Sequence, residues 1–372
     1  MSRKKLLLVG GGHAQLEILN HLQDTTRDGI DVTMLSPEEK HLYSGMAPGR
    51  LSGTYDREEL TLPIRKLTEA GGGSFEKGWA TAVDPERRVV HDHRGNSFSY
   101  DVVSFNVGSR VPFERVVPEA EREAIGRTIF PAKPVACLDA ARIRLTAIRP
   151  PRKIAVVGGG PGGCEIAANI AWDLRRRGVA ASVTLFAAGS VVPRQSEAFR
   201  RYLRARLLEL KVDIREGARV DSVHAGGIVV AGHYHEAEMT ILAIGVAPPR
   251  LFADSGLPTG AAGGLLVNRS LQCVTYPEIF GAGDCIEIEG MPLDRVGVHA
   301  LREAPVLRQN VVASLKGKAL ERFTSKNEYL LICNLAGGYG VGTKWFVTAR
   351  GGLIGRLKER IDRWFVNSHR PV

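Results

Sequence analysis

The chain has few cysteines, few aromatic residues and no long apolar run. Its five cysteines are widely spaced and form no C-x-x-C motif, and their odd number argues against a secreted disulfide framework. Aromatic residues make up only 6% of the chain and its basic residues are scattered, so we expect no nucleic acid partner. No apolar stretch is long enough to span a bilayer, and we predict no transmembrane helix.

The remaining composition is that of a globular protein with an excess of positive charge. Its 372 residues are enough for two or three domains, and 44% of them are hydrophobic. The net charge of +10 predicts an anionic partner, such as phosphate groups or acidic lipid headgroups. We expect a reducing cytoplasmic environment, and we predict no metal site.

One structural plan occurs twice along the chain. The first copy opens with KKLLLVGGGHAQLEIL (4–19), continues with the strand DVTMLSP (31–37) and ends in a strand that reaches Gly108. The second copy opens with RKIAVVGGGPGGCEI (152–166), continues with SVTLFAAG (182–189) and closes at Gly245. Each copy is typical of a βαβ nucleotide-binding unit with inserted antiparallel strands. We therefore predict an α/β fold of two interleaved Rossmann-like domains.

The two glycine-rich loops match the G-x-G-x-x-G pattern to different degrees. The second loop has all three glycines, which are Gly158, Gly160 and Gly163. The first loop has Gly10 and Gly12 but Gln15 at the third position, which predicts a helix set slightly apart or a side chain turned outward. A glycine turn that binds nothing is the alternative for a single loop, but two loops in the same context favour two dinucleotide sites.

Two further segments resemble known flavoproteins. PEIFGAGDCI (277–286) resembles the second FAD signature of the two-dinucleotide-binding flavoproteins, in which an aspartate, here Asp284, binds the ribityl chain. Asp284 could instead only cap a helix. LSPEEKHLYSGMAPG (35–49) resembles their loop along the flavin. The whole chain resembles the pyridine nucleotide–disulfide oxidoreductase superfamily, above all type II NADH:quinone dehydrogenases and sulfide:quinone oxidoreductases, and also a flavoprotein group sometimes fused to selenophosphate synthetase.

The resemblance implies that the first loop holds FAD and the second holds NAD(P)H. The implied FAD contacts are Gly10, Gly12, His13, Ala14, Ser36, Ser44, Met46, Ala80, Gly108, Gly283, Asp284 and Val298. The implied NAD(P) contacts are Gly158, Gly160, Gly163, Glu165 and Gly245. Ala187 and Ala188 stand where a carboxylate for a ribose 2′-hydroxyl is expected, and no arginine lies beside them in sequence, although Arg194 is near.

Two regions of the sequence bear on the chemistry beside the flavin and on the electron acceptor. They are the surroundings of Cys333 and the helix-like segment 294–317. EYLLICNLAGGYGVGTKWF (328–346) resembles the C-terminal segment of sulfide:quinone oxidoreductases, whose cysteine carries sulfur beside the flavin. That chemistry needs a second cysteine, and Cys164 is offset from its expected place; a buried structural thiol is the alternative for Cys333. In the dehydrogenases two glutamines face the quinone, whereas Val298 and Glu303 stand there in this chain.

The C-terminal segment GGLIGRLKERIDRWFVNSHR (351–370) is typical of an amphipathic helix in a membrane interface. Apolar and basic residues are predicted on its membrane face: Ile354, Leu357, Ile361, Trp364 and Phe365, flanked by Arg356, Lys358, Arg360 and Arg363. We expect a protein associated with the cytoplasmic face of an anionic membrane. A helix packed on the core, or a contact in a homodimer, is the alternative.

Together these features predict an FAD domain of residues 1–112 and 250–318, an NAD(P)-binding domain of residues 150–249 and a C-terminal cap of residues 319–372. The predicted activity is FAD-dependent electron transfer from NAD(P)H to a quinone-type acceptor. Sulfide oxidation through Cys333 and a non-catalytic flavin-binding redox sensor are the alternative hypotheses.

Overall fold

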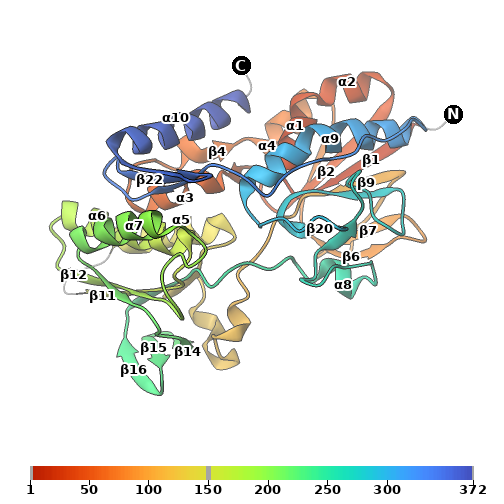
Figure 1. Ribbon diagram of the computed structural model, residues 1–372. Helices are drawn as coiled ribbons and strands as arrows, with labels where there is room; N and C mark the ends of the chain where they lie inside the picture. The colour runs from red at the N-terminus through yellow and green to blue at the C-terminus, as the bar shows by residue number, and fades with distance from the viewer. Residues whose placement is uncertain (1–2, 148–151, 371–372) are drawn as a thin grey trace.

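Two α/β bodies lie side by side, and the C-terminal segment packs across both of them (Figure 1). The computed structural model describes residues 3–147 and 152–370. Each body contains a five-stranded sheet, and the orders are β19-β9-β1-β2-β5 and β10-β17-β11-β12-β13. All strand pairs within these two sheets are parallel. The prediction of an α/β fold with two Rossmann-like sheets is confirmed.

The first body is built from segments on either side of the second. Its sheet strands are β1 (Lys4–Val9), β2 (Ile30–Ser36), β5 (Ser74–Lys77), β9 (Val102–Phe105) and β19 (Ile279–Gly281). Its helices are α1 (His13–Asn20), α2 (Leu22–Arg27), α3 (Ala47–Leu51), α4 (Ile64–Ala70) and α9 (Gly297–Leu315). A meander of β6 (Ala80–Asp84), β7 (Val89–Asp92) and β8 (Ser97–Ser99) is attached to it. Because β19 returns to pair with β9, the second body is an insertion between these two strands.

The second body repeats this arrangement. Its sheet strands are β10 (Ile129–Pro131), β11 (Arg152–Val157), β12 (Ala181–Phe186), β13 (Val212–Arg215) and β17 (Met239–Leu242). Its helices are α5 (Val135–Thr146), α6 (Pro161–Arg176) and α7 (Glu197–Glu209), and its meander is β14 (Val220–His224), β15 (Gly227–Val230) and β16 (His233–Glu236). Strand β10 and helix α5 belong to this body although they precede residue 150. The predicted boundary at residues 150 and 151 lies outside the described residues.

Short elements complete the first body, and residues of each enter its core. They are β3 (His41–Leu42), β4 (Thr61–Leu62), α8 (Leu251–Asp254), β18 (Leu265–Val267) and β20 (Ile286–Ile288). The C-terminal segment consists of an antiparallel sheet of β21 (Leu331–Asn334), β22 (Gly340–Lys344) and β23 (Val347–Gly351), followed by α10 (Gly352–Ser368). Phe365 and Val366 of α10 enter the core of the first body, whereas Cys333 and Val341 enter that of the second.

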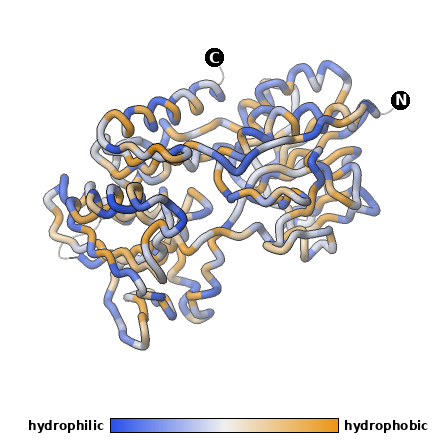
Figure 2. The backbone as a smooth tube through the Cα atoms, in the orientation of Figure 1, coloured by the Kyte–Doolittle hydropathy of each residue, from blue (hydrophilic) through white to orange (hydrophobic). Residues whose placement is uncertain are grey.

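Helix α10 does not present the whole apolar face that the sequence predicts. Along its tube in Figure 2, hydrophobic and hydrophilic residues alternate. Phe365 points into the core, and Lys358 forms a half-buried ion pair with Asp362 at 2.6 Å, so neither belongs to an exposed face. The prediction for these two residues was wrong because the helix packs against the protein on that side. Leu353, Leu357, Ile361 and Trp364 remain exposed.

Candidate functional site

A deep cleft lies at the carboxyl end of the first sheet, where parallel α/β sheets bind their ligands. The first glycine loop, the end of β2 at Ser36, Gly108 after β9 and Asp284 after β19 line it. The cleft encloses about 1430 Å³, its open mouth included. Segments more than 270 residues apart in the chain therefore form one cavity.

The first glycine loop is held in place by two buried amides. Gly12 lies so close to Asn106 that a Cβ atom on Gly12 would come within 2.2 Å of the Asn106 Oδ1. The same Oδ1 accepts a hydrogen bond of 2.9 Å from the backbone N–H of Ala14. Gln15 is fully buried and its Nε2 donates to the Ser104 carbonyl at 2.7 Å. The prediction that Gln15 turns outward was wrong, because its side chain fastens α1 to the end of β9.

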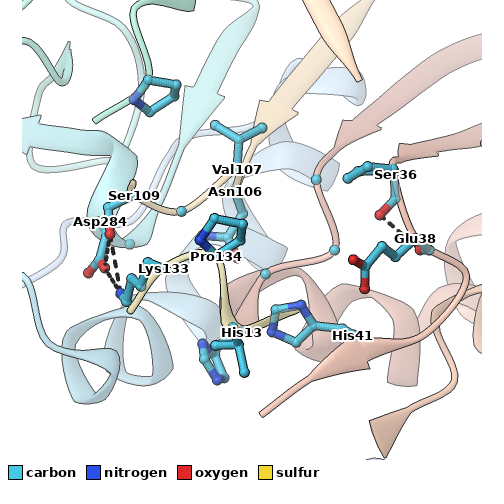
Figure 3. A pocket seen from close by; sticks show the side chains of 18 of the residues that line it. His13, Ser36, Glu38, His41, Asn106, Val107, Ser109, Lys133, Pro134 and Asp284 are labelled. Atoms are coloured by element: carbon cyan, nitrogen blue, oxygen red, sulfur yellow. Dashed lines mark hydrogen bonds and ion pairs between the residues drawn. The ribbon is translucent and has the colours of Figure 1, made fainter. Parts of the chain in front are cut away.

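Asp284 lies at the inner end of this cleft as an ionised acceptor. Its carboxylate accepts a hydrogen bond of 2.7 Å from Ser109 and forms an ion pair of 2.5 Å with Lys133 (Figure 3). Burial raises the pKa of Asp284, but the Lys133 charge and these hydrogen bonds outweigh burial and hold it below its usual value. Only a 3-10 turn begins here, and α9 starts later, at Gly297, which disfavours a capping role.

The loop around Asp284 is supported by Glu303, whose position the sequence placed opposite a quinone. The buried Glu303 carboxyl instead accepts a hydrogen bond of 2.6 Å from the Gly283 N–H. Burial raises its pKa to about 7. Glu303 therefore shapes the turn that presents Asp284 to the cleft.

Two neutral histidines lie side by side in the cleft lining (Figure 3). The ring centroids of His13 and His41 are 5.3 Å apart. Burial, above all, lowers the pKa of His13 to about 3 and that of His41 to about 4. The Nε2 atom of each ring is buried without a hydrogen-bond partner among the described residues. Such atoms are costly unless a ligand or water meets them, so the lining suits a polar ligand.

These residues fit FAD. The positive end of helix α1, behind the glycine loop, suits a pyrophosphate, and Asp284 suits a hydroxylated chain. Most of the predicted FAD residues line the cleft: Gly10, Gly12, His13, Ser36, Ser44, Ala80, Gly108, Gly283 and Asp284. Ala14 and Met46 are buried outside this lining, and Val298 is also outside it, although its neighbours Gly297 and Ala300 are part of it. Their roles as FAD contacts stay predictions.

Several lining residues were missed from the sequence. They are Trp79, Asn106, Ser109 and Lys133, whereas Glu38, which the sequence places close behind Ser36, also lines the cleft. Glu38 lies two residues after Ser36, and Ser36 donates a hydrogen bond of 3.1 Å to the Glu38 carbonyl. Burial raises the pKa of the Glu38 carboxyl. A carboxylate thus stands near the end of β2 after all, displaced by two positions from the usual place.

A second cleft occupies the corresponding edge of the second sheet. All five predicted NAD(P) residues line it, namely Gly158, Gly160, Gly163, Glu165 and Gly245. The space is larger, about 2900 Å³ with its open mouth. The half-buried Glu165 accepts a hydrogen bond of 2.7 Å from the Asn334 N–H, and desolvation of its carboxyl raises its pKa to about 7.

Two glycines of the second loop allow segments of the backbone to lie close together, and the third leaves space in the cleft. A Cβ atom on Gly163 would lie 1.9 Å from the Gly158 carbonyl oxygen, and one on Gly158 would lie 2.1 Å from that of Ala243. Gly158 also has a φ of +125°, which favours glycine. A Cβ on Gly160 would meet nothing within 4 Å. Its side therefore faces open cleft and leaves room for a ligand to reach the backbone.

The two clefts meet. Ser44, Lys133 and Val135 contribute to the lining of both. Ligands that fill the clefts from opposite ends would therefore approach each other beside these three residues.

Cys333 lies outside both linings. It is fully buried in β21, and neither cleft includes it. Burial, with smaller contributions from Glu165 and the Cys164 thiol, raises the pKa of Cys333 well above its usual value. A protonated thiol is a poor nucleophile, so this environment favours the structural alternative.

Two parallel sheets, each with a glycine loop over its own cleft, give this α/β chain one candidate dinucleotide site in each body. The family described as pyridine nucleotide-disulphide oxidoreductase matches residues 4–313. This match covers most of the chain, which therefore belongs to this family of oxidoreductases and is itself an oxidoreductase.

The relatives and solved structures agree with this assignment. The type II NADH:quinone oxidoreductase of Staphylococcus saprophyticus is 22% identical over 97% of this chain and 94% of the relative. The nitrite reductase [NAD(P)H] of Bacillus subtilis is 27% identical over 78% of this chain, which spans only 35% of that relative.

Two solved structures superpose on nearly the whole chain. The sulfide:quinone oxidoreductase from Aquifex aeolicus has a TM-score of 0.80 at 16% identity, covering 99% of this chain and 92% of that one. NDH2 from Plasmodium falciparum, in complex with NADH, has a TM-score of 0.79 at 15% identity, covering 99% and 97%. At these identities the superpositions establish the fold alone.

Proposed function

We propose that the protein is an FAD-dependent oxidoreductase that takes electrons from NAD(P)H and passes them to a small quinone-type acceptor. The meeting of the two clefts at Ser44, Lys133 and Val135 carries this proposal. A dinucleotide in each cleft would bring the redox-active end of one toward that of the other. Relatives named as quinone oxidoreductases support the choice of acceptor.

The residues of the first cleft would hold FAD at defined positions. The start of α1 would bind the pyrophosphate, Asp284 the ribityl hydroxyls, and Ser36 and Glu38 the adenosine end. When bound, FAD supplies an acceptor for two electrons that can be released one or two at a time. Lys133 would keep Asp284 ionised and add positive charge where the clefts meet.

An anaerobic absorbance titration tests the electron donor. The purified yellow protein is titrated with NADPH and, separately, with NADH, and we expect either or both to bleach the oxidised flavin band. A matched variant, Gly160→Val, fills the open side of the second loop and should slow bleaching while the flavin stays bound. Bound FAD that neither nucleotide reduces would contradict the proposal.

We also propose that the protein binds an anionic membrane from its cytoplasmic side, where it would meet the acceptor. None of the described helices combines the length and hydropathy needed to cross a bilayer. The hairpin of β22 and β23 exposes Trp345 and Phe346, whose exposed fractions are 69% and 93%. On α10, Leu353 and Trp364 are exposed at 74% and 69%. Exposed aromatic residues among arginines are typical of an interfacial anchor.

Co-sedimentation with vesicles that contain anionic lipid tests the anchor. Replacing Phe346 and Trp364 by serine should weaken vesicle binding strongly, and Tyr234→Ser, on the exposed hairpin of the second body, should not. Vesicle binding that is unaffected by the double substitution would rule the surface out and would favour a homodimer contact there.

The alternative activities have less support. Sulfur oxidation would need Cys333 as a thiolate near the flavin, and this thiol is buried outside both linings. A flavin-binding sensor without turnover would explain the first cleft but not the second. Bound FAD that no donor reduces would favour this alternative.

A further inference from the structure

The part of the second cleft that would bind the adenosine ribose lacks the carboxylate that usually binds an unphosphorylated 2′-hydroxyl. In dinucleotide-binding domains, a carboxylate at the end of the second strand accepts hydrogen bonds from the 2′-hydroxyl of NAD, and an arginine accommodates the 2′-phosphate of NADP. Strand β12 ends at Phe186, and the next two residues are Ala187 and Ala188. Ala187 is buried against Gly159, so the expected position carries no polar side chain.

An arginine from a later segment lines the cleft next to a residue that is bonded to Ala187. The backbone N–H of Ala218 donates to the Ala187 carbonyl at 2.9 Å, and the Ala187 N–H donates to the Arg215 carbonyl at 2.9 Å. The chain that follows β13 is thus bonded directly to the end of β12. Arg219, the residue after Ala218, lines the cleft. This arginine could not be recognised beside the two alanines in the sequence, because Arg219 lies 31 residues beyond Ala188.

Arg219 is available to a ligand, whereas the nearest carboxylates are engaged. Its side chain is exposed and makes no ion pair or hydrogen bond within residues 3–147 and 152–370. Glu216 is not in the cleft lining; it accepts from the Val191 N–H at 2.8 Å and pairs with Arg204. Asp221 also lines the cleft, two residues beyond Arg219, and its Oδ2 accepts a hydrogen bond of 3.1 Å from the Gly232 N–H.

A second arginine adds charge to the same lining. Arg194 lines the cleft and forms an ion pair of 2.9 Å with Asp294, and it is largely exposed. The hydroxyl of Ser190 lies in the loop between β12 and Arg194 and also lines the cleft. An arginine fork, a second guanidinium and a hydroxyl suit a phosphate dianion better than a ribose diol.

We propose that the second cleft selects the dinucleotide that carries a 2′-phosphate, and that Arg219 is the residue that recognises this phosphate. This inference rests on the proposed function, since it names which nicotinamide nucleotide the same cleft takes. NADPH then pairs its 2′-phosphate with Arg219, while NADH leaves the guanidinium without a partner and finds no carboxylate at the end of β12 for its 2′-hydroxyl.

Binding of adenosine fragments tests this specificity without turnover. FAD-loaded protein is titrated calorimetrically with adenosine 2′,5′-bisphosphate and with adenosine 5′-monophosphate. We expect the bisphosphate to bind at least about 10-fold more tightly, because a charge-assisted arginine–phosphate pair is worth that factor or more. Arg219→Gln should remove most of this difference and leave the affinity for the monophosphate unchanged. Arg201→Gln, an exposed arginine of α7 outside the cleft lining, is the control of equal charge change.

A second variant tests the same position from the opposite direction. Ala188→Asp places a carboxylate on the exposed cleft residue that follows the end of β12, where it should repel the bisphosphate and shift flavin reduction from NADPH toward NADH. Equal affinity for the two fragments in the unmodified protein, or an Arg219→Gln variant that retains the difference, would overturn the specificity while the oxidoreductase proposal stands. If neither fragment binds and neither NADPH nor NADH reduces the flavin, both proposals fail.

Discussion

The two glycine loops perform the same task with different chemistry. In the second body the helix comes close to the strand because Gly163 has no side chain to separate it from Gly158. In the first body the corresponding residue is Gln15, whose buried amide bonds the Ser104 carbonyl at 2.7 Å. A glycine at the third position of the pattern is therefore one of two ways to pack the helix on the sheet. The other way is a polar side chain that bonds the helix to the sheet.

The difference extends to the residue that follows the returning strand. After β9 the first body has Asn106, which bonds both the Ala14 N–H and, at 2.6 Å, the Ala282 carbonyl. After β17 the second body has Ala243, whose carbonyl oxygen lies directly against Gly158. The first loop is thus held by side chains in addition to backbone contacts, and the second by backbone contacts, which predicts different responses to substitution.

The largest effect is expected for Gly163→Ala. A Cβ atom there would overlap the Gly158 carbonyl oxygen at 1.9 Å, so the start of α6 must move. We expect a loss of about 3 kcal/mol in the free energy of unfolding, together with loss of nucleotide binding in the second cleft. Urea denaturation and a calorimetric titration with NADPH measure these two effects. A variant with unchanged stability would show that the second loop can accommodate a Cβ atom at residue 163. It would contradict the conclusion that close backbone contact holds this loop.

A smaller loss in the free energy of unfolding is expected for Gln15→Gly, although this substitution completes the G-x-G-x-x-G pattern of the first loop. The change leaves a buried cavity and removes the donor to the Ser104 carbonyl. We expect a destabilisation of about 2 kcal/mol, in spite of the restored pattern. Thermal denaturation with saturating FAD measures it, and Gln23→Gly on α2 provides a helix-propensity control. A more stable Gln15→Gly variant would mean that the amide is only a tolerated replacement.

These contrasts also explain what the sequence could and could not predict. The glycine loops and the strands before them were predictable because apolar runs and glycine spacing are local signals. Asp284 was predictable from its GAGD motif. The partners of Asp284 were not, since Lys133 and Ser109 come from 151 and 175 residues away. Arg219 was missed for the same reason, because only the pairing of Ala218 with Ala187 brings it to the cleft.

The same limit applies to the direction of single side chains. The helical spacing of the apolar residues in α10 predicted a single apolar face. Packing against the first body decides that Phe365 points inward while Trp364 is exposed. For Gln15 the sequence allowed an outward side chain, and the hydrogen bond that its amide donates to the Ser104 carbonyl decides the inward one. Local patterns predict which elements form, and tertiary partners determine which face of each element is used.

A moderate, pH-dependent effect is expected at Glu165, the buried carboxyl of the second cleft. Burial raises its pKa from 4.5 to about 7 in the folded chain. Below pH 4.5 both folded and unfolded states keep the proton; as pH rises toward 7 the unfolded state releases it first, so stability falls across this window. We expect Glu165→Gln to abolish this fall, which should be on the order of 2–3 kcal/mol.

Chemical denaturation of the FAD-loaded protein at a series of pH values between 4.5 and 8 measures this dependence. Glutamine keeps an oxygen that can accept the Asn334 N–H, so the fold should survive the substitution. Glu119→Gln removes an exposed carboxyl and should leave the pH profile as it is. Parallel profiles for the Glu165 variant and the unmodified protein would show that this carboxyl is already ionised in the folded state.

The smallest effect is expected for Cys333→Ser, and it separates the two electron-transfer hypotheses. If electrons enter through the second cleft, the buried thiol only fills space, and turnover with NADPH or NADH should stay within about twofold. A hydroxyl in this apolar position should cost about 1 kcal/mol of stability, and Cys273→Ser, a buried thiol in the other core, should cost a similar amount. Steady-state rates and thermal denaturation measure both. Turnover that is lost in Cys333→Ser alone, with flavin still bound, would move the reaction from the second cleft to the thiol and would make the second glycine loop a scaffold.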